Sequence, residues 1–362
     1  MKNKKIVFVI NALKVGGAAK MIQFVANSCV GQFGSVHFIS LYDTESLGSL
    51  DNSIVRHNLG INSKGNRITR RFIVVNALRK EIKSIRPDIV CSFVSDVCYY
   101  TRIATLGMPC IVMSAERGDP NIEPWWAKPI IRWAYNHSDY CFFQLEKARD
   151  YFGSKVIKKS FVIPNPFGPS SNVLPHYGKH NKTIVSAGRF TWQKGYDTLI
   201  KAFAKVHAKH PDYTLLLYGE GPLLGEYKSL CGELNIVDAV EFPGYTNDVM
   251  DTIRKEGIFV LSSRYEGIPN SLIEAMTMKL PIVATDCTPG GADFLTKHGE
   301  NGILIPVDDV NAMSEGIMRI IEDQSLYSAL SEKSANILED LQPSKISALW
   351  IRAFNQVINQ TK

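Results

Sequence analysis

The chain lacks the patterns that mark several common classes of protein. Its seven cysteines form no Cys-x-x-Cys pair and stand at positions 29, 91, 98, 110, 141, 231 and 287. An odd number of scattered cysteines, mostly in apolar runs, is typical of reduced core thiols in a cytoplasmic protein, so we predict no disulfide framework. No segment approaches the ~20 apolar residues that a helix needs to cross a bilayer. The chain is therefore expected to be soluble or bound at a membrane surface.

The usual sequence signs of a metal site are absent as well. There is no Asp-x-Asp pair, and no His-x-x-x-His motif encloses a glutamate. His176 and His180 are four residues apart, but they lie in a proline-rich stretch, where solvated histidines are the simpler interpretation. We predict no metal ion and no separate cofactor.

The composition is that of a globular enzyme with two cores. The 362 residues exceed what one core holds, and 45% are hydrophobic while 21% are charged. The net charge of +6 has two explanations, colloidal solubility or an anionic partner. A nucleic-acid partner is not expected, because the basic residues are not interleaved with surface aromatics in a known module.

One predicted helix carries much of the positive charge. Its apolar residues recur at three- and four-residue spacing, which predicts a buried stripe with solvated charges opposite it. A peripheral helix on an anionic membrane is the alternative, and Trp125, Trp126 and Lys128 would suit the same surface. The apolar set is Ile68, Phe72, Val75, Leu78, Ile82 and Ile85, and the basic set is Arg67, Arg70, Arg71, Arg79, Lys80, Lys83 and Arg86.

Short β-branched runs alternate with helical patterns along the whole chain, which predicts parallel βαβ units. The first apolar run superficially resembles a signal peptide, but with only about six residues it is interpreted as a strand. Strands are predicted at Lys4–Ile10, Val36–Leu41, Ile89–Phe93, Ile111–Ser114 and Phe161–Ile163, and then at Thr183–Ala187, Thr214–Tyr218, Val240–Phe242, Phe259–Leu261, Pro281–Ala284 and Ile303–Ile305.

A proline-rich stretch without periodicity separates the two alternating sets. We predict a first Rossmann-like domain over 1–165, a linker over 166–181 and a second Rossmann-like domain over 182–342. A last helix within 343–362 can pack back on the first domain. The predicted fold class is α/β, with two doubly wound domains facing each other across a cleft and ligands at the carboxyl ends of the strands.

Two basic residues stand between a predicted strand and a predicted helix in SAGRFTWQKGYDTLI. Arg189 and Lys194 lie in this loop, with Gly188 and Gly195 beside them. A guanidinium, an ammonium and a helix N-terminus can together neutralise a departing diphosphate without a metal. The alternative is two solvated cations in a connecting loop.

Two carboxylates stand eight residues apart in SSRYEGIPNSLIEAM. Glu266 lies in a loop beside Gly267, and Glu274 lies one turn into the apolar run that follows. A capping box, Ser271-x-x-Glu274, is the structural alternative for the second carboxylate. It leaves Glu266 unexplained.

These two stretches resemble the donor site of the retaining glycosyltransferases of family 4, whose signature is Glu, seven residues, Glu. The resemblance is strong over 183–310 and looser over 1–165, and it implies the GT-B fold. It implies that Glu274 binds the ribose hydroxyls, that Glu266 contacts the donor sugar, and that Arg189 and Lys194 stabilise the diphosphate. The further donor contacts that it implies are Gly16, Gly17, Gly244, Tyr245, Gly267, Ile268, Pro269, Asn270 and Ser271.

The pattern GEGPLLG at 219–225 superficially resembles a dinucleotide fingerprint. Its glycine spacing differs, and Pro222 removes an amide donor, so we reject a nicotinamide site. The pattern is more similar to a Gly-Asp/Glu-Gly-Pro turn that is common in family 4.

The segment SAERGDP occupies the region of the first domain where many members of the family have a histidine. No histidine occurs between His57 and His137. The segment instead resembles the Ser-Glu-Arg-Asn-Asp-Pro stretch of a subgroup that builds bacterial exopolysaccharides and O-antigens. Glu116, Arg117 and Asp119 are therefore candidates for acceptor recognition or proton transfer, and a structural salt bridge is the alternative.

The resemblance implies a metal-independent retaining glycosyltransferase that moves a hexose or N-acetylhexosamine from a uridine diphosphate sugar. The acceptor that it implies is a glycan on a polyprenyl diphosphate, so the enzyme would be cytoplasmic or peripheral on the inner face of the bacterial membrane. Two other functions fit the same build. A sugar-nucleotide epimerase would interconvert donors without an acceptor, and a non-catalytic nucleotide-sugar-binding protein would never release diphosphate.

Overall fold

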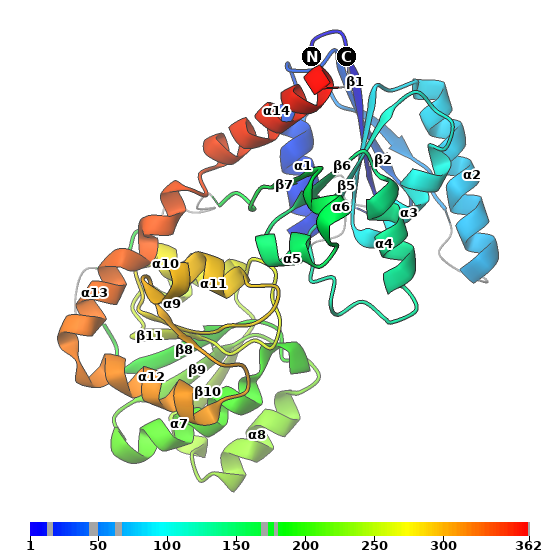
Figure 1. Cartoon of the computed structure of the whole chain (residues 1–362). Coiled ribbons are helices and arrows are strands. Elements are labelled where there is room, and N and C mark those ends of the chain that lie inside the picture. The colour runs from blue at the N-terminus through cyan, green and yellow to red at the C-terminus, as the bar shows by residue number, and fades with distance from the viewer. Residues whose placement is uncertain (13–16, 43–49, 62–66, 168–172, 177–179, 361–362) are drawn as a thin grey trace. The chain divides into compact units, whose positions relative to one another are not determined.

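The chain folds into two compact units, each built around its own parallel sheet (Figure 1). The computed structural model describes residues 1–12, 17–42, 50–61, 67–167, 173–176 and 180–360. Unit 1 comprises Met1–Pro166 together with Pro343–Lys362, and unit 2 comprises Phe167–Gln342. The predicted α/β class with two Rossmann-like sheets is confirmed.

Unit 1 contains a seven-stranded parallel sheet in the order β3-β2-β1-β4-β5-β6-β7. The order reverses between β1 and β4, which is the doubly wound arrangement expected of alternating βαβ units. The strands are β1 (Lys5–Ile10), β2 (Ser35–Ser40), β3 (Val55–Asn58), β4 (Ile89–Phe93), β5 (Ile111–Glu116), β6 (Tyr140–Phe143) and β7 (Ser160–Val162).

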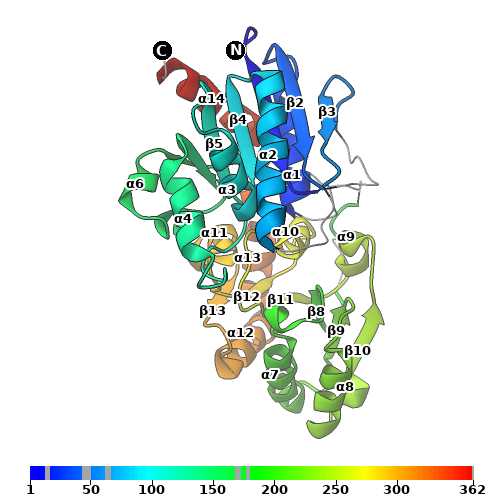
Figure 2. The same cartoon turned by 90° about the vertical axis from the view of Figure 1, so that its right-hand side faces the viewer.

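Helices cover both faces of this sheet (Figure 2). Because side chains alternate along a strand, Ile6 and Phe8 of β1 pack on one face with α1 and α14, while Val7 and Val9 pack on the other with α2 and α3. The helices are α1 (Gly17–Cys29), α2 (Arg67–Ile85), α3 (Ser95–Ala104), α4 (Lys128–His137), α5 (Glu146–Asp150), α6 (Ser154–Ile157) and α14 (Pro343–Gln360).

The C-terminal helix α14 supplies the centre of one of these cores. Trp350 is fully buried, and its ring stacks on Phe142 and Phe93 at centroid distances of 4.5 and 6.0 Å. One turn further on, Phe354 meets Phe33 and Phe8 edge to face, at 5.9 and 6.4 Å. Such aromatic clusters dominate the energetics of a core, so the last helix belongs to the first unit in packing as well as in position.

We expect Trp350→Ala to lower the free energy of unfolding of unit 1 by about 3–5 kcal/mol, the usual cost of truncating a buried tryptophan. Leu349→Ala is the matched control, because Leu349 is the exposed neighbour on the same helix; its effect should stay within about 0.5 kcal/mol. Urea unfolding followed by circular dichroism measures both. Equal stability of the two variants would show that α14 does not complete this core.

Helix α2 buries the predicted stripe only in part, because Leu78, Ile82 and Ile85 are buried and Phe72 is not. Val74, Leu78 and Ile82 are buried, whereas Phe72 is 68% exposed and Ile73 is exposed beside it. The prediction that Phe72 belongs to the buried stripe is wrong. The three- and four-residue spacing of the sequence also fits Val74, Leu78 and Ile82, and tertiary packing against β1, β2 and α3 selects that register.

Three basic residues in the second half of α2 have different surroundings. Arg79 does not belong to a free basic face, because its Nη1 donates to the carbonyl oxygens of Ala104 and Leu106 at 2.7 and 2.9 Å and so satisfies the end of α3. Lys80 and Lys83 are exposed. Among the described helices of the chain, none combines the length and the apolar character needed to cross a membrane.

Unit 2 contains a six-stranded parallel sheet in the order β10-β9-β8-β11-β12-β13. One core lies on the side of α7, α8 and α12, where Phe203, Leu217 and Ile317 are fully buried. The strands are β8 (Thr183–Ala187), β9 (Thr214–Tyr218), β10 (Val240–Gly244), β11 (Ile258–Leu261), β12 (Ile282–Thr285) and β13 (Ile303–Ile305), and the helices are α7 (Tyr196–Lys209), α8 (Leu224–Glu233), α9 (Val249–Ile253), α10 (Asn270–Thr277), α11 (Gly291–Thr296), α12 (Val310–Glu322) and α13 (Gln324–Ser334).

The eleven predicted strands all occur, four of them with the predicted ends and the others with ends displaced by at most two residues, but the sequence missed β3 and β6. Strand β3, with the sequence VRHN, lies at the edge of its sheet and is largely exposed, so it shows no apolar run. Strand β6, YCFF, is only four residues long and follows α4 closely. Edge position and short length are the physical reasons for the two omissions.

Candidate functional site

The order of strands in unit 2 brings the two predicted loops together. Strands β8 and β11 are neighbours, and the connections after them run to opposite sides of the sheet. Loops 188–195 and 262–269 therefore leave adjacent strands at the point where the strand order reverses. In doubly wound sheets this is where ligands bind.

An ion pair joins these loops. The Nζ atom of Lys194 lies 2.6 Å from Oε1 of Glu266, and the hydroxyl of Ser263 donates to the same oxygen at 3.2 Å. The side chains of Lys194 and Glu266 are only 14% and 12% exposed, so solvent screens the charges weakly. The two residues that sequence analysis assigned to diphosphate and sugar thus form one cluster.

The second cation of the loop, Arg189, differs from Lys194 in its exposure to solvent. Arg189 is exposed, two residues after the end of β8. Within the described residues, its guanidinium makes no hydrogen bond or ion pair. It is therefore available for charge-assisted hydrogen bonds to an anion, as the diphosphate role requires.

Glycines allow the turn at 219–223 to hold this loop. A Cβ on Gly219 would stand 1.9 Å from the carbonyl oxygen of Gly188, and one on Gly221 would stand 2.5 Å from that of Phe190. The Phe190 amide donates to the carbonyl of Glu220 at 2.8 Å, which locks the two segments together. The pattern that resembles a dinucleotide fingerprint thus supports the Arg189 loop by backbone contact.

We expect Gly219→Ala to lower the free energy of unfolding of unit 2 by about 1–3 kcal/mol, because the added methyl group overpacks this contact and the residue has a φ of +141°. Gly232→Ala is the control, since a Cβ there meets nothing within 4 Å. Placed in α8, it should stabilise by about 0.5 kcal/mol. Thermal unfolding measures both variants. Equal melting temperatures would show that the contact between Gly219 and Gly188 accommodates a methyl group without loss of stability.

Helix α10 places the second glutamate. It begins at Asn270, its N-cap is Pro269, and no side chain caps it. The capping-box alternative is therefore wrong, because Ser271 lies within the first turn and not at the N-cap. Glu274 lies one turn into the helix and is partly exposed. Capping of α10 therefore does not account for this carboxylate, and the ribose contact stays a prediction.

The segment between the glutamates is held by its backbone. The Glu266 amide donates to the carbonyl of Thr288 at 2.9 Å, and a Cβ on Gly291 would stand 1.5 Å from the carbonyl oxygen of Gly267. Ile268 and Pro269 are buried, so their side chains form the base of the loop. Any contact of Ile268 or Pro269 with a ligand would come from the backbone.

Two of the predicted donor contacts, Gly244 and Tyr245, lie at the end of the outer strand β10. Gly244 ends β10 with φ +92°, and its carbonyl accepts from the Gly219 amide at 2.8 Å. Tyr245 follows it and is exposed. The Gly219 turn thus connects this strand end to the Arg189 loop.

The predicted site residues of unit 1 lie in two segments of the chain. Gly16 lies outside the described residues, and Gly17 is the first residue of α1. Glu116 is buried, and its carboxylate accepts four hydrogen bonds: at 2.7 and 3.0 Å from the hydroxyls of Ser95 and Tyr135, and at 3.0 Å each from the amides of Arg117 and Gly118. A carboxylate satisfied by four donors is a structural anchor.

Asp119 and Arg117 also make contacts within unit 1. Asp119 is buried, and its Oδ1 accepts from the amide and the side chain of Asn121, both at 2.9 Å. Arg117 stacks over Trp350 at 5.2 Å from the ring centroid and donates to the carbonyl of Ile163. These contacts give the segment a structural role, and its part in acceptor recognition or proton transfer stays a prediction.

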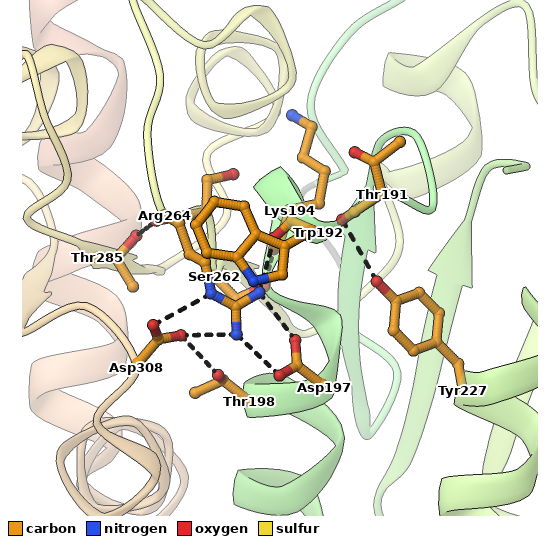
Figure 3. Close-up of polar contacts among 11 residues, drawn as sticks. Thr191, Trp192, Lys194, Asp197, Thr198, Tyr227, Ser262, Arg264, Thr285 and Asp308 are labelled. Carbon is orange, nitrogen blue, oxygen red and sulfur yellow. Dashed lines mark hydrogen bonds and ion pairs between the residues drawn. The ribbon is translucent and has the colours of Figure 1, made fainter. Parts of the chain in front are cut away.

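Sequence analysis missed one residue that the site contains. Arg264 lies in the signature loop two residues before Glu266, and its guanidinium contacts Trp192, Asp197 and Asp308 (Figure 3). The available signal was a third cation in a stretch already identified as a site. Its partners lie in other loops, which the sequence does not connect.

Comparison with known proteins agrees with this fold. Residues 175–337 match the family model for glycosyl transferases group 1. An uncharacterised glycosyltransferase of Haemophilus influenzae is 28% identical over 353 residues, covering 95% of this chain and 97% of that protein. A Campylobacter jejuni α-1,4-N-acetyl-D-galactosaminyltransferase, named for an undecaprenyl-diphosphate-linked acceptor, is 24% identical over 98% of this chain and 99% of its own. Anabaena HepE in complex with UDP superposes with a TM-score of 0.79 at 17% identity, over 97% of this chain and 100% of its own.

The two doubly wound sheets and the matches together define a class. The protein is a glycosyltransferase with the GT-B fold. More particularly, it is similar to glycosyltransferases of the family 4 type, which its two loops resemble. The roles of individual residues in the site stay predictions.

Proposed function

We propose that the protein is a retaining, metal-independent glycosyltransferase that uses a UDP-sugar and a lipid-linked glycan acceptor in bacterial surface polysaccharide synthesis. The observation that carries the proposal is the cation arrangement in unit 2. Lys194 is held against Glu266, and Arg189 is exposed nearby in the same loop with an unpaired guanidinium. Two cations beside a helix start provide the charge that a departing diphosphate requires.

The proposed reaction follows from this placement. The bond between the anomeric carbon and the diphosphate oxygen breaks while the acceptor hydroxyl attacks from the same face. The hydroxyl proton passes to the departing phosphate oxygen, so no covalent sugar on Glu266 is required. Arg189 and Lys194 stabilise the charge that develops on the diphosphate, Glu266 contacts the sugar, and Glu274 binds the ribose.

The UDP donor and the acceptor rest on supporting comparisons. The HepE structure holds UDP in a chain of the same fold. The Campylobacter relative is named for a polyprenyl-diphosphate-linked glycan acceptor. The acceptor sugar would bind in unit 1, where a cavity of about 410 Å³ opens beside the ends of β1 and β4. Among its lining residues are Asn11, Asp96, Tyr99, Glu123 and Trp126.

The chemistry of this cavity suits a saccharide. Asp96 and Glu123 supply carboxylates that can accept hydrogen bonds from hydroxyl groups, and burial raises the pKa of both. Trp126 and Tyr99 supply aromatic faces for the apolar side of a sugar ring. These features support acceptor binding and do not identify the sugar.

Arg189→Ala should reduce kcat/KM for UDP-sugar transfer about 100- to 1,000-fold, the usual loss on removing one well-placed donor to a developing negative charge. Arg254→Ala is the matched control, because Arg254 pairs with Asp251 on the surface of the same unit. Purified protein is incubated with a panel of UDP-sugars and a polyprenyl-diphosphate glycan, and transferred sugar and released UDP are measured. Near-normal transfer by folded Arg189→Ala protein would remove the proposed site.

The same assay separates the other two functions. An epimerase would produce a new UDP-sugar with no acceptor present, and a non-catalytic protein would bind a UDP-sugar without releasing UDP. Addition of EDTA tests metal independence, which predicts unchanged transfer.

We further propose that the exposed face of α2 contacts an anionic membrane. Lys80 and Lys83 provide charge there, and the exposed Phe72 and Ile73 provide apolar contact. Each basic residue near such a surface contributes about 1 kcal/mol of binding free energy. The location would then be peripheral on the inner face of the cell membrane.

Lys80→Glu/Lys83→Glu should weaken binding to phosphatidylglycerol-containing vesicles about tenfold or more. Lys209→Glu/Lys333→Glu makes the same charge change at exposed positions of unit 2 and should have a smaller effect. Vesicle cosedimentation measures both. Equal binding by the two double variants would refute a specific role for α2 and leave the catalytic proposal intact.

A further inference from the structure

We infer that Arg264 is a positioning residue for the transfer reaction: its guanidinium joins three loops at the carboxyl edge of the unit 2 sheet and so fixes Lys194 beside Glu266. The inference rests on the proposed function, because it assigns Arg264 a role through the proposed diphosphate-stabilising lysine. Arg264 itself would not touch the donor.

The guanidinium is almost fully used by protein partners (Figure 3). It forms a bidentate pair of hydrogen bonds with Asp197, at 3.1 Å from Nη1 to Oδ1 and 2.8 Å from Nη2 to Oδ2. Nη1 also donates to the carbonyl of Trp192 at 2.6 Å, and Nε donates to Asp308 at 3.1 Å. The side chain is only 9% exposed, so this is a built junction and not a surface ion pair.

These partners lie on either side of Lys194 in the chain. Trp192 and Lys194 share the single 3-10 turn Trp192–Lys194, and Asp197 is the second residue of α7, three residues after the lysine. Arg264 therefore holds both ends of the short segment that carries Lys194. On its own loop, Arg264 precedes Glu266 by two residues, so both members of the ion pair are anchored to one guanidinium.

Backbone contacts make the coupling stiff. The Arg264 amide donates to the carbonyl of Gln193 at 2.8 Å, and the Gln193 side chain donates back to the carbonyl of Tyr265 at 3.0 Å. The hydroxyl of Ser262 donates to the carbonyl of Lys194 at 2.7 Å. The two loops therefore cannot shift independently without breaking several hydrogen bonds.

The close approach at Gly195 shows how little space separates the loops. Gly195 has φ +62°, and a Cβ there would stand 2.2 Å from the carbonyl oxygen of Ser262. A third loop joins through Asp308, which follows β13 and also accepts from the hydroxyl of Thr198 at 3.1 Å. One arginine thus connects segments that follow β8, β11 and β13.

Electrostatics favour the charged state of this junction. Burial works to raise the pKa of Asp197, but the hydrogen bonds and charge of Arg264 outweigh it and lower the pKa. Asp197 also lies in the first turn of α7, where the helix dipole favours a negative charge. The indole of Trp192 covers the guanidinium at 4.8 Å from the ring centroid, while the ring itself stays 63% exposed.

The geometry requires an arginine. A lysine carries the same charge but lacks the planar fork that reaches two carboxylates and a carbonyl together. If Arg264 acts by geometry, Arg264→Lys should lose most of the effect although the charge remains. If net charge alone matters, Arg264→Lys should restore activity.

The test is a double-mutant cycle with Lys194. We expect Arg264→Lys and Arg264→Gln to lower kcat for UDP-sugar transfer about 10- to 100-fold, with the donor KM changed about threefold or less, because a displaced Lys194 stabilises the departing diphosphate less. In a Lys194→Ala background, the same Arg264 substitutions should cost about twofold or less, because their effect passes through the missing lysine. Arg254→Gln is the control and should not change kcat in either background.

Three results would overturn the inference. They are full activity of Arg264→Lys, an equal loss in both backgrounds, or a loss fully explained by a lower melting temperature at the assay temperature. Asp308→Asn keeps the side-chain shape and removes one charge, so it gives a milder second variant should Arg264→Gln fail to fold. An intermediate loss of kcat that depends on Lys194 would support the inference. An unchanged kcat would oppose it. Absence of transfer and of UDP-sugar binding by the unsubstituted protein would instead refute the proposed function.

Discussion

The ion pair between Lys194 and Glu266 is the interaction around which unit 2 is arranged. Both side chains are mostly removed from water, and taking two charges out of water costs several kcal/mol per ion before their attraction offsets it. A buried ion pair of this kind is weak evidence for stability. Its presence at the sheet edge is better explained by the proposed role of Lys194 and Glu266 in the transfer reaction. The surrounding loops are built by backbone contact so closely that the pair keeps one geometry.

Close backbone approach is the means by which the sheet edge is made rigid. Gly195, Gly219 and Gly291 each stand where a Cβ atom would collide with a backbone carbonyl of a neighbouring segment. Glycines in such loops are easily interpreted as cradles for phosphate. Here their first physical role is to let peptide groups from different strands touch, and a ligand-binding role can only be added to that constraint.

The sequence predicted those parts of the fold and the site that short stretches encode. Buried strands of parallel sheets are continuous β-branched runs, and Arg189, Lys194 and Glu266 stand directly after such runs, so their gathering at one edge followed from topology. Contacts between distant segments could not be predicted. Arg264 meets partners 67 and 44 residues away, and Glu116 accepts hydrogen bonds from hydroxyls of two other elements. In α2 the spacing allowed two registers, and packing against neighbouring elements buries Val74 and exposes Phe72.

The place of α14 has a consequence for the order in which the protein forms. The ring of Trp350 fills a space between strands that are synthesised more than two hundred residues earlier. While the ribosome is still making the middle of the chain, the face of the unit 1 sheet that packs against α14 lacks this helix. Unit 2, whose residues are continuous in the chain, has no such delay. The apolar residues that α14 covers therefore stay without this partner in the nascent chain until residues 343–360 are synthesised.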